Sequence, residues 1–187
     1  MAKQMTDVHK VFVSYFHEED QQYRNEFERL CKDVMVSRSI RPGDIDTDTN
    51  TERVMQKIRD EYLRDSTVLV VLIGPHTWQR KYVDWEIYSS LRHTASSPRS
   101  GLLGILLPNY PGYEKNEYYP HTIPPRLYDN LKKSNGGESS ADIYKWSEEP
   151  LTVHEWINYA FSKRNSITPD LHRPRFGKNH IGEEWTD

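Results

Sequence analysis

The chain has 187 residues, which is long enough for one hydrophobic core and predicts a single domain. Its 28 acidic and 25 basic residues give a formal net charge of −3 and a pI near 6.2. This balance provides no electrostatic case for nucleic acid or an anionic membrane as the main partner. Aromatic residues make up 12% and the apolar runs are sharply localised, which argues against disorder throughout.

The first half of the chain alternates between strand and helix patterns. Residues 10–16 are β-branched and aromatic, and they predict a first strand. Asp20 is a suitable N-cap for a helix whose apolar positions, ending at Val34, follow helical spacing. A short second strand is expected at 34–36. The cysteine at position 31 falls in the helical pattern and predicts a small buried residue, not a disulfide partner.

A turn-rich loop at 41–48 leads to the next helix, which Thr51 is expected to cap. The run 67–73 is apolar without interruption, as in a parallel strand buried on both faces. The segment after it predicts a helix that ends near Leu91, with Glu86 at its start and a core stripe that includes Val83.

The second half begins with an expected strand at 102–107. A Tyr- and Pro-rich insertion at 108–140 follows, with one turn of helix at 126–128. A final strand is expected at 142–146, and a last helix contains Trp156. These elements would form one domain over residues 1–163.

The polar segment 164–187 is expected to be a tail that either wraps the surface or is mobile. Strands that alternate with helices predict an α/β fold with a parallel sheet covered on both faces. Right-handed crossovers favour a flavodoxin-like doubly wound sheet of about five strands in the order 2-1-3-4-5. Residues 1–7 lack the apolar core of a signal peptide, and no run approaches the roughly 18 apolar residues of a membrane span, so a cytoplasmic protein with no membrane partner is expected.

Several cofactor and metal motifs are missing from the sequence. No glycine-rich dinucleotide fingerprint follows the first strand, and no phosphate-binding lysine loop occurs. Residues 44–48 begin like a calcium loop, but Thr49 and Met55 replace the glycine and glutamate that such a loop requires. We therefore expect no bound cofactor and no metal.

Chemically useful side chains follow two of the expected strands, at the edge where open α/β folds bind their ligands. Aromatic rings can sandwich a planar heterocycle and hydroxyls can bind ribose. A carboxylate can stabilise an oxocarbenium-like centre as a glycosidic bond breaks. By spacing alone, a single glutamate on a helix is more often a solvated surface residue, and Tyr82 and Trp85 are more often packing residues than substrate contacts. The catalytic candidate is Glu86, and the substrate-binding candidates are Ser14, Tyr15, Phe16, Gly74, His76, Trp78 and Tyr82.

Four segments, 11–15, 43–46, 57–68 and 80–87, together resemble a TIR domain, specifically the TIR-like proteins of the bacterial Thoeris antiphage system. The resemblance covers residues 9–107 and implies the flavodoxin-like fold. Many TIR domains cleave the nicotinamide–ribose bond of NAD, so NAD is implied as a substrate. Their catalytic glutamate lies four residues after an aromatic position.

The resemblance implies that infection triggers NAD conversion into an ADP-ribose-derived signal, cyclic or conjugated, that activates a separate effector. It also implies self-association through TIR–TIR contacts, with the loop at 37–50 and the helix from Thr51 facing the neighbour. One departure concerns residues 36–39, where related domains often carry an acidic residue, so the loop at 37–50 is assigned no catalytic role.

Two other functions remain open. A non-catalytic interaction module would use the Tyr- and Pro-rich insertion as its interface. A receiver-like domain is weaker, because its acidic positions are occupied here by 14–16 and Gly74.

Overall fold

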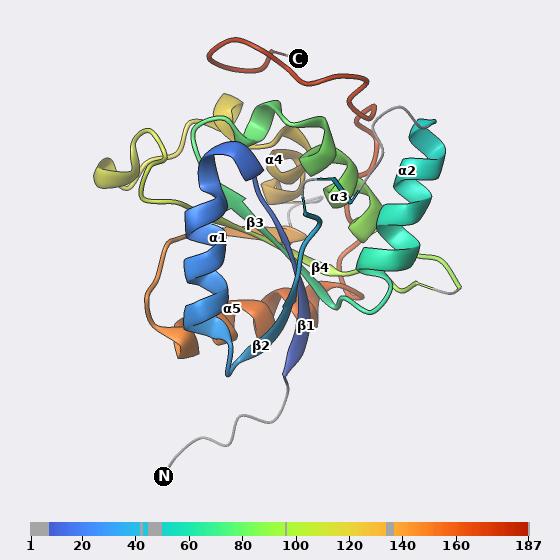
Figure 1. The fold of residues 1–187 in the computed structure, drawn as a ribbon, viewed down its shortest axis with the longest axis horizontal. Coiled ribbons are helices and arrows are strands. Elements are labelled where there is room, and N and C mark those ends of the chain that lie inside the picture. The colour runs from blue at the N-terminus through green and yellow to red at the C-terminus, as the bar shows by residue number, and fades with distance from the viewer. Residues whose placement is uncertain (1–7, 42, 45–49, 96, 134–136, 187) are drawn as a thin grey trace.

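The computed structural model describes residues 8–41, 43–44, 50–95, 97–133 and 137–186. Its centre is one parallel sheet of five strands in the order β2-β1-β3-β4-β5, which confirms the predicted α/β class and strand order (Figure 1). The strands are β1 (His9–Ser14), β2 (Met35–Arg38), β3 (Val68–Ile73), β4 (Gly101–Leu106) and β5 (Ala141–Lys145).

Helices cover both faces of the sheet, so the central strand β3 is buried along its whole length. Its side chains alternate between two hydrophobic clusters, because successive residues of a strand point to opposite faces. One cluster packs under α1 (His17–Cys31) and α5 (Pro150–Lys163). The other packs under α2 (Thr51–Lys57), α3 (Lys81–Leu91) and α4 (Pro125–Leu131).

The first helix starts earlier than predicted, at His17, so the prediction of Asp20 as its N-cap was wrong. Asp20 lies within the helix and is fully buried. Its carboxylate accepts a hydrogen bond of 3.0 Å from Asn109 Nδ2 and a longer one of 3.5 Å from Thr77 Oγ1. Burial raises the pKa of this carboxyl, and these two hydrogen bonds oppose the shift.

The second helix is also capped one residue away from the prediction. Asn50 is the N-cap, because its side-chain oxygen accepts the Glu52 amide at 2.9 Å, and Thr51 is the first helical residue. After Lys57 the helix continues with π-helical geometry over Ile58–Leu63. Residues 42 and 45–49 of the preceding loop, which include most of the calcium-like segment, lie outside the described residues.

The insertion at 108–140 contains more helix than predicted. It includes two 3-10 turns, Tyr113–Lys115 and Pro120–Thr122, and α4 extends the single expected turn to Pro125–Leu131. The segment that follows α5 packs against the body of the protein as far as Trp185, which is buried. The indole Nε1 of Trp185 donates a hydrogen bond of 2.8 Å to the Ile123 carbonyl, so this segment wraps the surface.

Candidate functional site

The site is built where β1 ends beside α3. Ser14 is the last residue of β1, and its hydroxyl donates a hydrogen bond to Oε2 of Glu86. Glu86 lies in the second turn of α3. The sequence had suggested a position at the start of this helix. Both residues are buried, and Glu86 is only 4% exposed. Parallel pairing of β1 with β3 is what places the end of β1 next to the helix that follows β3.

Burial raises the pKa of Glu86 from 4.5 to about 8, because the charged form is poorly solvated there. The hydrogen bond from Ser14 lowers this pKa but does not offset the desolvation. The carboxyl is therefore largely protonated at neutral pH in the free protein. A shift of this size in a cavity is typical of functional carboxyls.

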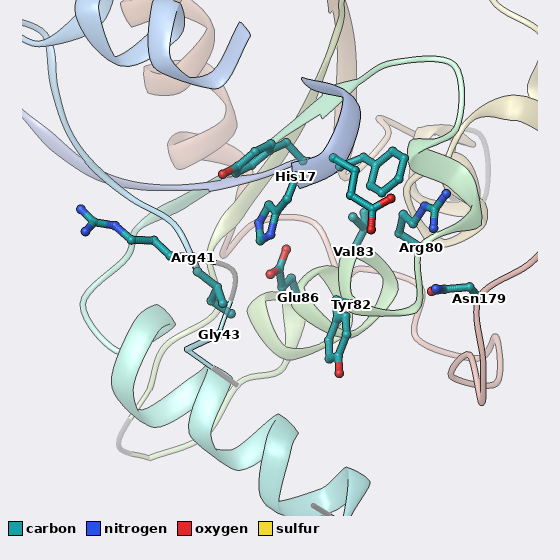
Figure 2. A pocket seen from close by; sticks show the side chains of 12 residues that line it. His17, Arg41, Gly43, Arg80, Tyr82, Val83, Glu86 and Asn179 are labelled. Carbon is teal, nitrogen blue, oxygen red and sulfur yellow. The ribbon is translucent and has the colours of Figure 1, made fainter. Parts of the chain in front are cut away.

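A cavity of about 350 Å³ lies over Glu86 (Figure 2). Its walls come from the β1–α1 turn, the loop after β2, the start of α3 and the C-terminal segment (residues 164–186). Of the eight expected site residues, four line this cavity. A fifth, Ser14, is not part of the lining but donates a hydrogen bond to Glu86. The four are Tyr15, Phe16, Tyr82 and Glu86.

The other three expected residues, Gly74, His76 and Trp78, lie outside the cavity lining. A side chain at Gly74 would meet the Asp20 carboxylate at 2.4 Å, so this glycine allows close packing of α1. His76 is exposed and contacts Glu19 at 2.9 Å, whereas Trp78 is 1% exposed. Trp78 belongs to the 3-10 turn Thr77–Gln79, whose three residues are buried.

The cavity also contains residues that sequence reasoning did not select: His17, Ile40, Arg41, Arg80 and Asn179. The Arg80 guanidinium lies 3.6 Å from the centre of the Phe16 ring, an arrangement that stabilises a cation on an aromatic face. Burial and the nearby Arg24 lower the pKa of His17. Arg80 belongs to a segment that carried the resemblance, but no signal in the sequence marked Asn179.

The arrangement combines aromatic walls, guanidinium groups and one deeply buried carboxyl. Figure 2 shows Glu86 between Arg41 on one side and Arg80 and Asn179 on the other. Such a site can hold a polar ligand with anionic groups and can stabilise a positive charge that develops next to Glu86. Among the residues that the structure describes, no three potential ligands gather to hold a metal ion, and no helix is long and apolar enough to cross a membrane.

Comparison with known proteins identifies the family. A search of curated proteins found no match. The family model of the Thoeris protein ThsB, TIR-like domain, matches residues 12–111, just over half of the chain. This region contains β2, β3, β4 and all but the first residues of β1, together with Ser14, the aromatic cavity residues and Glu86. The chain therefore belongs to the ThsB TIR-like domain family of the Thoeris defence system.

Proposed function

We propose that the protein cleaves the nicotinamide–ribose bond of NAD and makes an ADP-ribose-derived signal that activates a separate antiphage effector. The observation that carries this proposal is Glu86, a buried carboxyl with a pKa of about 8 that faces an aromatic-walled cavity. Membership of the ThsB TIR-like family supports it.

In the proposed reaction, the bond between the ribose C1′ and the nicotinamide nitrogen breaks, and its electron pair leaves with nicotinamide. Positive charge develops on C1′ and the ring oxygen. The Glu86 carboxylate stabilises this charge and accepts a hydrogen bond from the ribose diol. A hydroxyl of the same molecule, water or another nucleophile then attacks C1′ and loses its proton.

The raised pKa of Glu86 suits this role. The nicotinamide ring of NAD carries a positive charge, and a cation close to a buried carboxyl favours its ionised form. Substrate binding therefore lowers the pKa of Glu86 and produces the carboxylate where it is needed. Tyr15, Phe16 and Tyr82 line the same cavity and provide apolar surface for the planar ring.

The test compares nicotinamide release from NAD by the unaltered protein and by Glu86→Gln, measured by chromatography. The assay includes lysate from phage-infected cells as the trigger, and mass spectrometry identifies the product. Glu148→Gln makes the same chemical change at an exposed position and serves as the control. We expect release by the unaltered protein and the control, and a loss of at least about a hundredfold in Glu86→Gln.

Equal nicotinamide release by all three proteins would show that Glu86 has no catalytic role. Inactivity of all three in infected-cell lysate, together with a stoichiometric protein partner, would instead favour a non-catalytic interaction module.

A further inference from the structure

The C-terminal segment lies beyond the region that the family model matches, yet buried hydrogen bonds hold it to α3 and α4. Arg126 of α4 forms a bidentate ion pair with Asp84 of α3, at 2.8 and 3.3 Å. The same guanidinium donates to the Arg173 carbonyl at 2.9 Å, and Asp84 accepts the Phe176 amide at 2.9 Å. Both charged groups are buried, so the backbone at 173–176 is anchored inside the protein.

From this anchor the segment runs past the start of α3. The Trp85 indole donates to the Phe176 carbonyl at 2.8 Å, and the His180 amide donates to the Gln79 carbonyl at 2.8 Å. Between these two contacts lies Asn179, whose Oδ1 accepts the Lys81 backbone amide at 3.0 Å. Asn179 is thereby held at the wall of the cavity over Glu86 (Figure 2).

The bond to Lys81 fixes the orientation of the Asn179 side chain. Oδ1 accepts this bond, so the amide NH₂ of Asn179 points in the other direction. This NH₂ group has no hydrogen-bond acceptor among the described residues. Arg80 lines the same end of the cavity, and its Nε also lacks a partner within the described part of the chain. This end of the cavity therefore presents N–H donors and a positive charge.

Glu18 is the other acidic residue that lines the cavity. The Arg41 side chain points away from Glu86 in Figure 2, so Arg80 is the basic group on the Asn179 side of the cavity. Phosphate oxygens are the natural ligands of guanidinium and amide N–H groups. In a nicotinamide dinucleotide, the diphosphate is joined to the ribose that Glu86 is expected to hold.

We propose that the C-terminal segment is part of the substrate site, and that Asn179 donates a hydrogen bond to the diphosphate beside Arg80. This rests on the proposed function, since it assumes that a dinucleotide occupies the cavity. Asn179 acts on binding and leaves the chemical step to Glu86.

Two substitutions separate substrate contact from a structural role. Asn179→Asp keeps an oxygen acceptor for the Lys81 amide but replaces the NH₂ donor with a second, negatively charged oxygen. Asn179→Ala removes both the oxygen acceptor and the NH₂ donor. A merely structural Asn179 would tolerate Asp better than Ala, whereas a phosphate ligand would tolerate Asp worse, because the charges repel. Lys178→Ala, on the same exposed stretch, is the matched control.

The experiment measures equilibrium binding by calorimetry in a Glu86→Gln background, which prevents turnover. The titrants are NAD, ADP-ribose and nicotinamide riboside, which lacks phosphate. We expect Asn179→Ala to weaken NAD and ADP-ribose binding about tenfold and Asn179→Asp to weaken it further. Nicotinamide riboside binding and the Lys178→Ala control should not change.

Equal binding of NAD by the parent and Asn179→Asp would overturn this inference alone. An equal loss for the riboside would also overturn it, since the contact would not be to phosphate. If the parent bound neither NAD nor ADP-ribose, both this inference and the proposed function would fail.

Discussion

Glu86 is a buried carboxyl, and burying its charged form costs folding free energy. Its environment stabilises the neutral form, and Ser14 is the only hydrogen-bonding partner recorded for its side chain among the described residues. Groups that a site needs for chemistry often reduce stability in this way, because the arrangement that suits the reaction is not the one that best suits the fold. Two measurements on single residues follow from this.

The first concerns stability against pH. The folded protein keeps the Glu86 proton up to about pH 8, whereas the unfolded chain releases it near pH 4.5. The unfolded state therefore binds fewer protons in this interval, and the free energy of unfolding falls as pH rises through it. Glu86→Gln removes this loss, so its stability relative to the unaltered protein should grow between pH 4.5 and 8, by at most about 5 kcal/mol.

Urea unfolding of both proteins at pH 4.5, 6.5 and 8.5 checks this expectation. Taking the difference between the two proteins cancels the other titrating groups. A difference that stays constant over this range would contradict a raised Glu86 pKa.

The second measurement concerns activity against pH. If the Glu86 carboxylate stabilises the transition state, kcat/KM for NAD should rise with pH and level off above about pH 8, since this ratio reports the free enzyme. The Ser14 hydrogen bond lowers the Glu86 pKa, so Ser14→Ala should move the midpoint to higher pH. Ser162→Ala on α5 is the control. An unchanged midpoint in Ser14→Ala would argue against the coupling of these two residues.

At the scale of elements, α3 is buried on more than one side. The predicted stripe of Val83, Ile87 and Leu91 faces the core, as expected. Asp84 and Trp85 are buried as well, because the C-terminal segment covers them. A helix enclosed in this way holds its side chains in one arrangement, and this gives Glu86 a defined position in the cavity lining.

The contact between β4 and α5 depends on a glycine. A Cβ at Gly101 would lie 2.3 Å from the carbonyl oxygen of Ala160, a backbone atom that cannot move without shifting α5. Gly101→Ala should therefore lower the free energy of unfolding by about 1–3 kcal/mol or more. Gly177→Ala is the matched control, because nothing lies within 4 Å of the added carbon. Thermal unfolding of the two variants measures the difference, and equal midpoints would refute the packing argument.

At the scale of the whole molecule, the cavity is too small to enclose its proposed substrate. A volume of about 350 Å³ is near the lower limit for ligand pockets, which bury roughly 70–90% of a drug-sized ligand. The loop after β2 contributes Ile40, Arg41 and Gly43 to the rim, so the part of the chain expected to face a neighbour borders the cavity. We propose that a second copy provides the remaining wall.

Activity per molecule should then rise with protein concentration, which turnover assays across a hundredfold dilution will show. Arg41→Glu should lower turnover without unfolding the domain, whereas the control Lys32→Glu, at the C-terminal cap of α1, should leave turnover unchanged. Asp44→Lys should also lower turnover, but Asp44 accepts the Arg41 amide at 2.8 Å, so part of its effect belongs to the loop itself. A flat specific activity, in a protein that remains monomeric throughout, would reject the shared site.

The fold and the centre of the site could be predicted from sequence because both depend on local patterns. Uninterrupted apolar runs identified β3 and β4, and right-handed crossovers favoured the doubly wound strand order that the structure shows. Residues that leave adjacent parallel strands meet at one sheet edge, so Ser14 and Glu86 could be expected to lie together. Tyr15 and Phe16 follow β1 and were expected at this edge for the same reason, whereas Tyr82 was expected from its spacing to Glu86 in the resemblance.

Only the tertiary structure decided which polar groups are buried and what they contact. Asp20 looked like a helix cap but is enclosed against Gly74, because the start of α1 packs on the end of β3. Asn179 belongs to a polar segment with no periodicity, and it reaches the cavity through an anchor at Asp84 that is distant in sequence. The pKa of Glu86 is likewise a property of its surroundings, since desolvation depends on every element that excludes water from it.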